Sequence, residues 1–313
     1  MTNLLLPRGL YFSTRFSWLP SWQAFDIDRV AILPLLTILI LLTNAPDVWY
    51  LRTPLIVLSV LALVYAPLRH SPAFWFVATA LLGTTIYLNW ESSDNHKYVI
   101  AYWCLALCAT FTVAAERQGE ALALSSRWLI GLCMCFATLW KVITPEYVDG
   151  TFFEYELLAD ERFARCAEYF GNLSAASLSD NRELRELLLH GYTRGMELAA
   201  VAFETSPQLR TLALFLTWWT VLMEGLLAVL FLWPDNKRVA IVRNALLIFF
   251  AASTYSVATV RGFGWMLMLL GLAQSSDRER FWRPLYLATF LLIQLYTLPT
   301  AAILEAVGVL GTK

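Results

Sequence analysis

Four polar side chains suited to acid–base chemistry stand within or beside long apolar stretches of the chain: Asn95, His96, Lys141 and Glu224. An imidazole exchanges protons near neutral pH, a neutral amine is a base, and a carboxyl group holds or releases a proton. An ionisable group inside a membrane is costly unless it is paired, hydrated or able to reach water. These residue types in such surroundings indicate proton transfer at a membrane site.

Most of these residues also have a purely structural interpretation. Asp94 and Asn95 precede a predicted helix, where such side chains accept hydrogen bonds from the first free amides, although a cap does not account for His96. Lys141 stands near the end of a predicted helix, so its ammonium group can extend along its own stem to water. A role of Lys141 as a base requires a neutral amine, which an apolar pocket would favour.

Glu224 lies near the middle of a long apolar segment, too deep for its carboxylate to reach water. It must therefore be protonated or paired with another polar group. Arg243, Asn244 and Arg261 are candidate partners, as is a polar group on the fourth or fifth apolar segment. A structural bridge between helices and a chemical role both fit this position.

The composition of the 313 residues indicates the class of protein that holds these side chains. Hydrophobic residues make up 58% and charged residues only 15%, against about 25% charged in soluble domains. Lys and Arg number 23 and Asp and Glu 24, so the chain lacks the basic surplus of a nucleic-acid binder. The five cysteines have no CxxC spacing and no ligands at metal-binding spacing, so we predict no metal.

Apolar runs near the length of a membrane-crossing helix predict an all-α, polytopic transmembrane bundle of about eight or nine spans. The candidate spans are residues 30–43, 54–68, 72–90, 98–115, 128–144, 211–233, 239–260, 263–273 and 282–304. The first, second and eighth are shorter than a full crossing. Residues 30–144 thus hold spans one to five and residues 211–313 the remainder. In residues 1–29 aromatic side chains alternate with arginines, which predicts a segment lying in the membrane interface.

Short cytoplasmic loops are enriched in Lys and Arg, which predicts a cytoplasmic amino terminus. That orientation places the His96 loop, the end of span five and the Arg261 turn on the extracytoplasmic side. The inner segments then contain Arg8, Arg15, Arg29, Arg69, Arg117, Arg127, Lys237, Arg238, Arg243, Arg278, Arg280 and Arg283, and the outer short segments Arg52, Lys97, Arg261 and Lys313.

Residues 145–210 form the one long polar connection between the predicted spans. Charges of alternating sign between apolar residues over 154–170 predict an amphipathic helix, and residues 181–203 predict a second. We expect a small extracytoplasmic helical insertion that caps the outer mouth of the bundle.

The motifs Asn95-His96-Lys97-Tyr98 and Tyr147-Val148-Asp149-Gly150, together with Lys141 and Glu224, resemble the horizontally transferred transmembrane family. That bacterial family is related to the vitamin K-dependent gamma-carboxylase, and the resemblance covers residues 26–274. It implies an integral protein of the bacterial inner membrane. Lys141 would be the base that deprotonates a reduced quinone, and His96 and Asn95 would support it.

The resemblance also implies a pocket for a quinol-like lipophile, and we assign Trp140, Tyr98, Glu224 and Arg261 to its lining. The chain departs from the family in several respects, among them Tyr147, where the family commonly has a Trp. Lys141 stands nine residues before Gly150, one more than the family spacing, and no histidine follows Glu224 in the next span. The chain stops soon after its last span, so we expect no luminal domain for a propeptide.

Two classes of function fit these observations. The first is a membrane enzyme, a gamma-carboxylase-like lyase or quinol-linked oxidoreductase, with membrane lipid around it and a peptide or thiol-redox protein as a candidate partner. The second is a non-catalytic transporter, or a partner subunit of a redox or export system, in which Lys141 reaches water and Glu224 bridges helices. Internal inverted repeats, which would favour a transporter, are not visible.

Overall fold

The protein is described by a computed structural model that covers residues 27–46, 48–190, 202–234, 236–258 and 260–296. Within these ranges the chain is helical and contains no strand. The α-helices are α1 (Arg29–Thr43), α2 (Trp49–Val64), α3 (Ala66–Arg69), α4 (Pro72–Leu88), α5 (Asn95–Thr110), α6 (Ala115–Ile143), α7 (Pro145–Val148), α8 (Thr151–Ala159), α9 (Ala164–Gly171), α10 (Ala175–His190), α11 (Pro207–Leu232), α12 (Lys237–Val257), α13 (Arg261–Gln274) and α14 (Trp282–Tyr296). Short 3-10 helices occupy Trp90–Ser92, Glu161–Phe163 and Asp277–Glu279.

Every predicted apolar span falls on a helix, which confirms the all-helical fold for the described residues. Three helices, α6, α11 and α12, are long and apolar enough to cross a membrane. Helices α1, α2, α4, α13 and α14 are apolar but shorter. The end of the last predicted span, 297–304, lies outside the described residues, as does nearly all of the predicted interfacial segment, 1–26.

Helix α6 is longer than the apolar run that predicted it. It begins at Ala115, because residues 115–127 are rich in Ala, Leu, Glu and Gln. These residues favour a helix whether their side chains are apolar or polar. It ends at Ile143, since Pro145 lacks the amide hydrogen that would continue the backbone ladder. Lys141 therefore stands in the last turn of a long rod.

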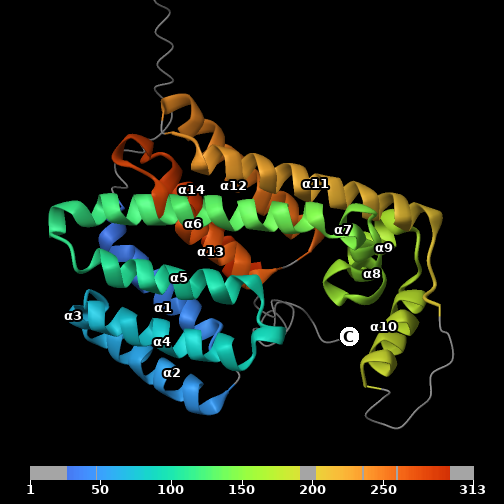
Figure 1. Ribbon diagram of the computed structural model, residues 1–313, viewed down its shortest axis with the longest axis horizontal. Helices are drawn as coiled ribbons and strands as arrows, with labels where there is room; N and C mark the ends of the chain where they lie inside the picture. The colour runs from blue at the N-terminus through green and yellow to red at the C-terminus, as the bar shows by residue number, and fades with distance from the viewer. Residues whose placement is uncertain (1–26, 47, 191–201, 235, 259, 297–313) are drawn as a thin grey trace, which may run out of the picture.

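The long helices lie side by side in a layered bundle (Figure 1). Helices α4, α5, α6 and α11 each contact the next in that order, and α13 packs against α1, α5, α6, α12 and α14. Helix α13 is the central element, because its residues from Trp265 to Leu270 are almost completely buried. Helices α7 to α10 gather at one end of the bundle, to the right in Figure 1.

Two glycines allow α13 to approach its neighbours closely. A Cβ atom at Gly264 would overlap the ring of Tyr255, whose hydroxyl donates a hydrogen bond to the carbonyl oxygen of Val260. A Cβ atom at Gly271 would overlap the ring of Tyr286, which is fully buried. The contacts of α13 with α12 and α14 therefore depend on the absence of side chains at these positions.

We expect Gly264→Ala to lower the free energy of unfolding by about 1–3 kcal/mol, because the Tyr255 ring is held by its hydrogen bond and cannot move aside cheaply. Gly83→Ala is the matched control, since nothing lies within 4 Å of a Cβ atom there. Denaturant unfolding of both variants in detergent micelles tests this expectation. Equal stabilities would show that the close contact with Tyr255 is not needed.

Helices α7 to α10, which belong to the predicted extracytoplasmic insertion and are called the outer helices below, have an apolar core of their own. Phe153, Leu157 and Phe163 pack with Leu209 and Ala213 of α11. The prediction of a single amphipathic helix over 154–170 is wrong, because α8 ends at Ala159 and α9 begins at Ala164. Asp160 causes the break, since its carboxylate accepts a hydrogen bond from the backbone N–H of Arg162 at 2.8 Å. The second predicted helix is present as α10 up to residue 190, and residues 191–201 lie outside the described residues.

Glu156 and Asp160 share the guanidinium group of Arg162, at 3.9 Å and 2.5 Å respectively. Burial raises the pKa of Glu156 to about 7, and a hydrogen bond with Asp160 adds to this effect. Burial opposes ionisation of Asp160 too, but hydrogen bonds from Arg162 lower the pKa of Asp160 below its usual value. Glu156 is therefore the member of the pair that holds a proton.

Because the folded protein binds the Glu156 proton more tightly than the unfolded chain does, the contribution of Glu156 to stability is complete below pH 4.5 and is lost as the pH rises toward 7. We expect hydrogen exchange in α8 and α9, corrected for its intrinsic pH dependence, to accelerate over this window. Glu156→Gln should abolish the acceleration, and Glu183→Gln on exposed α10 should preserve it. An unchanged profile in Glu156→Gln would exclude Glu156 as its source.

A buried polar cluster stands at the end of the bundle where α12 and α14 begin. Arg243 and Asn244 donate hydrogen bonds to Glu279 at 3.2 Å and 2.8 Å, while Gln274 and Tyr286 donate to Asn244 at 2.6 Å and 2.7 Å. Arg29 donates to the carbonyl oxygen of Ala273 and Arg283 to that of Ser275. The two arginines thus satisfy free carbonyl groups at the carboxyl end of α13.

Candidate functional site

Lys141 and Glu224 form an ion pair between α6 and α11. The ammonium group of Lys141 donates a hydrogen bond to Oε1 of Glu224, and the two side chains are only 14% and 8% exposed. The prediction that Glu224 pairs with a polar group on the fourth or fifth span is therefore confirmed. Lys141 faces the neighbouring helix, so the interpretation in which its stem extends to water is wrong.

Contacts between α6 and α11 show the register that brings the two side chains together. A Cβ atom at Gly131 would meet Leu232 and Phe231, and one at Gly225 would lie 3.6 Å from the methyl group of Thr138. Helices α6 and α11 therefore run antiparallel, with the last turn of α6 level with the middle of α11. Neither contact is visible as a motif, because the register between two helices depends on packing along their whole length.

The pair has one aromatic neighbour and one unused acceptor. The ring of Tyr147, on short helix α7, lies 5.3 Å from Nζ of Lys141 and stacks on Phe152 with centroids 4.6 Å apart. In the described part of the chain, the second oxygen of Glu224, Oε2, is buried without a hydrogen-bond partner. The free oxygen of Glu224 can accept one further donor.

Two candidate partners predicted for Glu224 are wrong. Arg243 and Asn244 bind Glu279 instead, because they face the polar cluster formed with Gln274 and Tyr286, whereas Glu224 faces α6. The side chain of the third candidate, Arg261, lies outside the described residues, so its predicted contact with a lipophile also stays a prediction.

His96 lies in the first turn of α5, against the start of α13. A Cβ atom at Gly262 would lie 2.5 Å from Cδ2 of the imidazole, and Nδ1 stands 3.9 Å from the carboxylate of Asp94. Asp94 occupies the position just before the helix but makes no capping hydrogen bond with its side chain. Among the described residues, the structure forms no hydrogen bond between His96 and Lys141.

Three more of the predicted site residues lie at the same end of the bundle. Asn95 is exposed and Tyr98 half-buried, both on the first turn of α5. Trp140 is 68% exposed, next to Lys141 but on the outside of α6. Because α5 and α6 are antiparallel neighbours, the start of α5 and the end of α6 share one end of the bundle (Figure 1).

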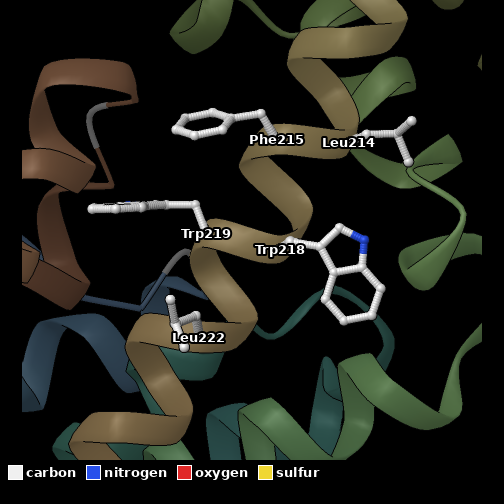
Figure 2. A pocket seen from close by; sticks show the side chains of 5 residues that line it. All are labelled: Leu214, Phe215, Trp218, Trp219 and Leu222. Atoms are coloured by element: carbon white, nitrogen blue, oxygen red, sulfur yellow. The ribbon is translucent and has the colours of Figure 1, made fainter.

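A hollow in the surface is lined by one face of α11: Leu214, Phe215, Trp218, Trp219 and Leu222 (Figure 2). Its lining is apolar, and Phe215, Trp218 and Leu222 are more than half exposed. At about 100° per residue, these side chains leave the helix on the side opposite Glu224. The hollow is therefore an outward-facing groove and does not open onto the ion pair.

Two features were not predicted from the sequence. Tyr147 was noted only as part of a motif, although its ring is the aromatic neighbour of Lys141. Trp265, near the start of α13, is 4% exposed, and its indole nitrogen has no hydrogen-bond partner among the described residues. No pattern in the sequence singles out Trp265, since a Trp in an apolar helix is ordinarily a packing residue.

Comparisons of the chain with models of protein families, with curated proteins and with solved structures give no match.

Proposed function

We propose that the chain is an integral membrane enzyme in which Lys141 and Glu224 act as an acid–base pair on a lipophilic, quinol-like substrate. The buried ion pair is the observation that carries this proposal. Helices α6, α11 and α12 would cross the bilayer, and the shorter apolar helices would complete eight or nine spans. The family resemblance supplies the substrate class, a reduced quinone, and a bacterial inner membrane, and the distribution of Lys and Arg supplies a cytoplasmic amino terminus.

The depth of the pair supports access from the lipid. Residues 128–143 of α6 and 212–233 of α11 are apolar, and the Gly131 contact places residue 128 of α6 level with residue 234. Residue 128, where the stretch of α6 begins, and residue 233, where the stretch of α11 ends, therefore lie at one level. We take this level as the inner edge of the hydrocarbon. At 1.5 Å per residue, Glu224 lies about 14 Å and Lys141 about 20 Å from that edge, within a core of about 30 Å.

The chemistry requires a neutral amine at the moment of proton transfer. In a dry site, the proton that Lys141 shares with Glu224 can move onto Oε1, which leaves a neutral amine beside a neutral carboxylic acid. The amine then accepts a proton from a substrate hydroxyl group and becomes ammonium, and the resulting oxyanion is stabilised by that ammonium. Glu224 thus serves as the proton store that makes Lys141 a base.

Mass spectrometry of lipids that copurify with the protein tests this proposal. A quinone should accompany the native chain and be lost from the double variant Lys141→Met/Glu224→Leu, which removes both charges together. Lys237→Met is the matched control, because Lys237 is an exposed lysine at the opposite end of the bundle. Equal recovery of the quinone from all three proteins would overturn the proposal and favour a non-catalytic membrane component.

A further inference from the structure

The outer helices lie at a definite height along α11, which their packing fixes. A Cβ atom at Gly150, just before α8, would lie 3.0 Å from Leu214, and one at Gly171, the end of α9, would lie 2.7 Å from Leu209. Leu214 stands about 28 Å and Leu209 about 36 Å from the inner end of the apolar stretch of α11, at 1.5 Å per residue. The far edge of a hydrocarbon core of about 30 Å falls between these two contacts.

Helices α8 and α9 cover only part of α11 at this height. Leu209, Ala213 and Leu216 are buried beneath them. Phe215 and Trp218, which lie on the groove face, remain 60% and 53% exposed. An apolar surface of this kind, continuous with a helix long and apolar enough to cross a membrane, is the surface that lipid covers.

The outer helices expose aromatic rings of their own. Tyr169 is 80%, Phe170 70% and Phe152 41% exposed, on the two helices, α9 and α8, that contribute to the small apolar core. Arg165 and Glu168 are exposed on the same short helix as Tyr169. Aromatic rings mixed with charged groups are typical of the headgroup region of a bilayer, where rings insert and charges stay hydrated.

We propose that α8 and α9 lie in the outer headgroup region of the bilayer, with the rings of Tyr169 and Phe170 inserted among the lipids. This placement rests on the bilayer crossing by α6 and α11 that belongs to the proposed function. It differs from a cap in water above the bundle, because the outer helices then bind lipid directly. Lys141, which lies below their level, is consequently covered by protein and lipid on the outer side.

Quenching by brominated lipids tests the placement in the full-length protein. A fluorescent amino acid is introduced in place of Tyr169, Phe170, Glu183 or Leu226, and each protein is reconstituted in phosphatidylcholine vesicles with or without bromine near the top of the acyl chains. Glu183 on α10 is the matched exposed control, and Leu226, 44% exposed on α11, reports the crossing itself.

We expect at least about twofold quenching at position 169, or at 170 if the first variant does not fold, and little at 183. Quenching at 226 without quenching at 169 and 170 would overturn the interfacial placement and would favour a protein partner or a second copy of the chain on these rings. Absence of quenching at 226 would instead refute the crossing on which the proposed function depends.

Discussion

Lys141→Met should lower the free energy of unfolding by about 3–5 kcal/mol, because it leaves the carboxylate of Glu224 buried without a counter-charge. Glu224 is only 8% exposed, and its second oxygen already has no hydrogen-bond partner among the described residues. Glu224→Leu alone should be destabilising for the same reason, since the ammonium of Lys141 would then be unpaired. The double variant should recover most of the lost stability.

The four proteins form a double-mutant cycle, measured by denaturant unfolding in one detergent. Lys237→Met serves as control and should leave stability within about 0.5 kcal/mol of the native value. Additive losses in the double variant would mean that Lys141 and Glu224 act independently. They would also remove the physical basis for treating the two residues as one acid–base unit.

Glu279→Ala should be comparably damaging, at about 3–5 kcal/mol, at the other end of the bundle. The carboxylate of Glu279 accepts hydrogen bonds from Arg243, Asn244 and Ser276, and Arg243 is 1% exposed. Loss of the Glu279 carboxylate removes a counter-charge from beside the buried guanidinium group of Arg243, between α12 and the central helix α13.

Asp277→Asn provides the matched comparison for Glu279→Ala. Asp277 also binds a buried arginine, Arg283, but the side chain of Asp277 is 79% exposed, so water screens this pair and we expect a loss of about 0–1 kcal/mol. Thermal unfolding of both variants measures the difference. If Asp277→Asn proved as destabilising as Glu279→Ala, burial would not be what makes this cluster important.

The fold was largely predictable because apolar runs of helical length are a local property of the chain. Each predicted span falls on a helix, and Pro145 ends α6 where a proline should. The break at Asp160 was missed, since a capping aspartate inside an amphipathic pattern is indistinguishable from an exposed one until the backbone turns. The number of bilayer crossings stays a prediction, because five of the apolar helices are shorter than a full span.

The Lys141–Glu224 contact could be narrowed from the sequence to a few candidate partners but not singled out. Lys141 and Glu224 were identified as misplaced charges by their depth in apolar segments, which is a property of each residue alone. Their contact depends on the register between α6 and α11, which results from packing along the whole length of both helices. For the same reason the pairing of Arg243 with Glu279 escaped prediction.

Infrared difference spectroscopy of the reconstituted protein is the most direct test of the central claim, that Lys141 and Glu224 exchange a proton during reaction with a lipophile. Adding a reduced naphthoquinone should change a band of a protonated carboxylic acid. That band should be absent in Glu224→Gln and unchanged in Lys237→Met. A native spectrum in which no carboxyl band responds to the naphthoquinone, or in which the responding band persists in Glu224→Gln, would contradict the claim.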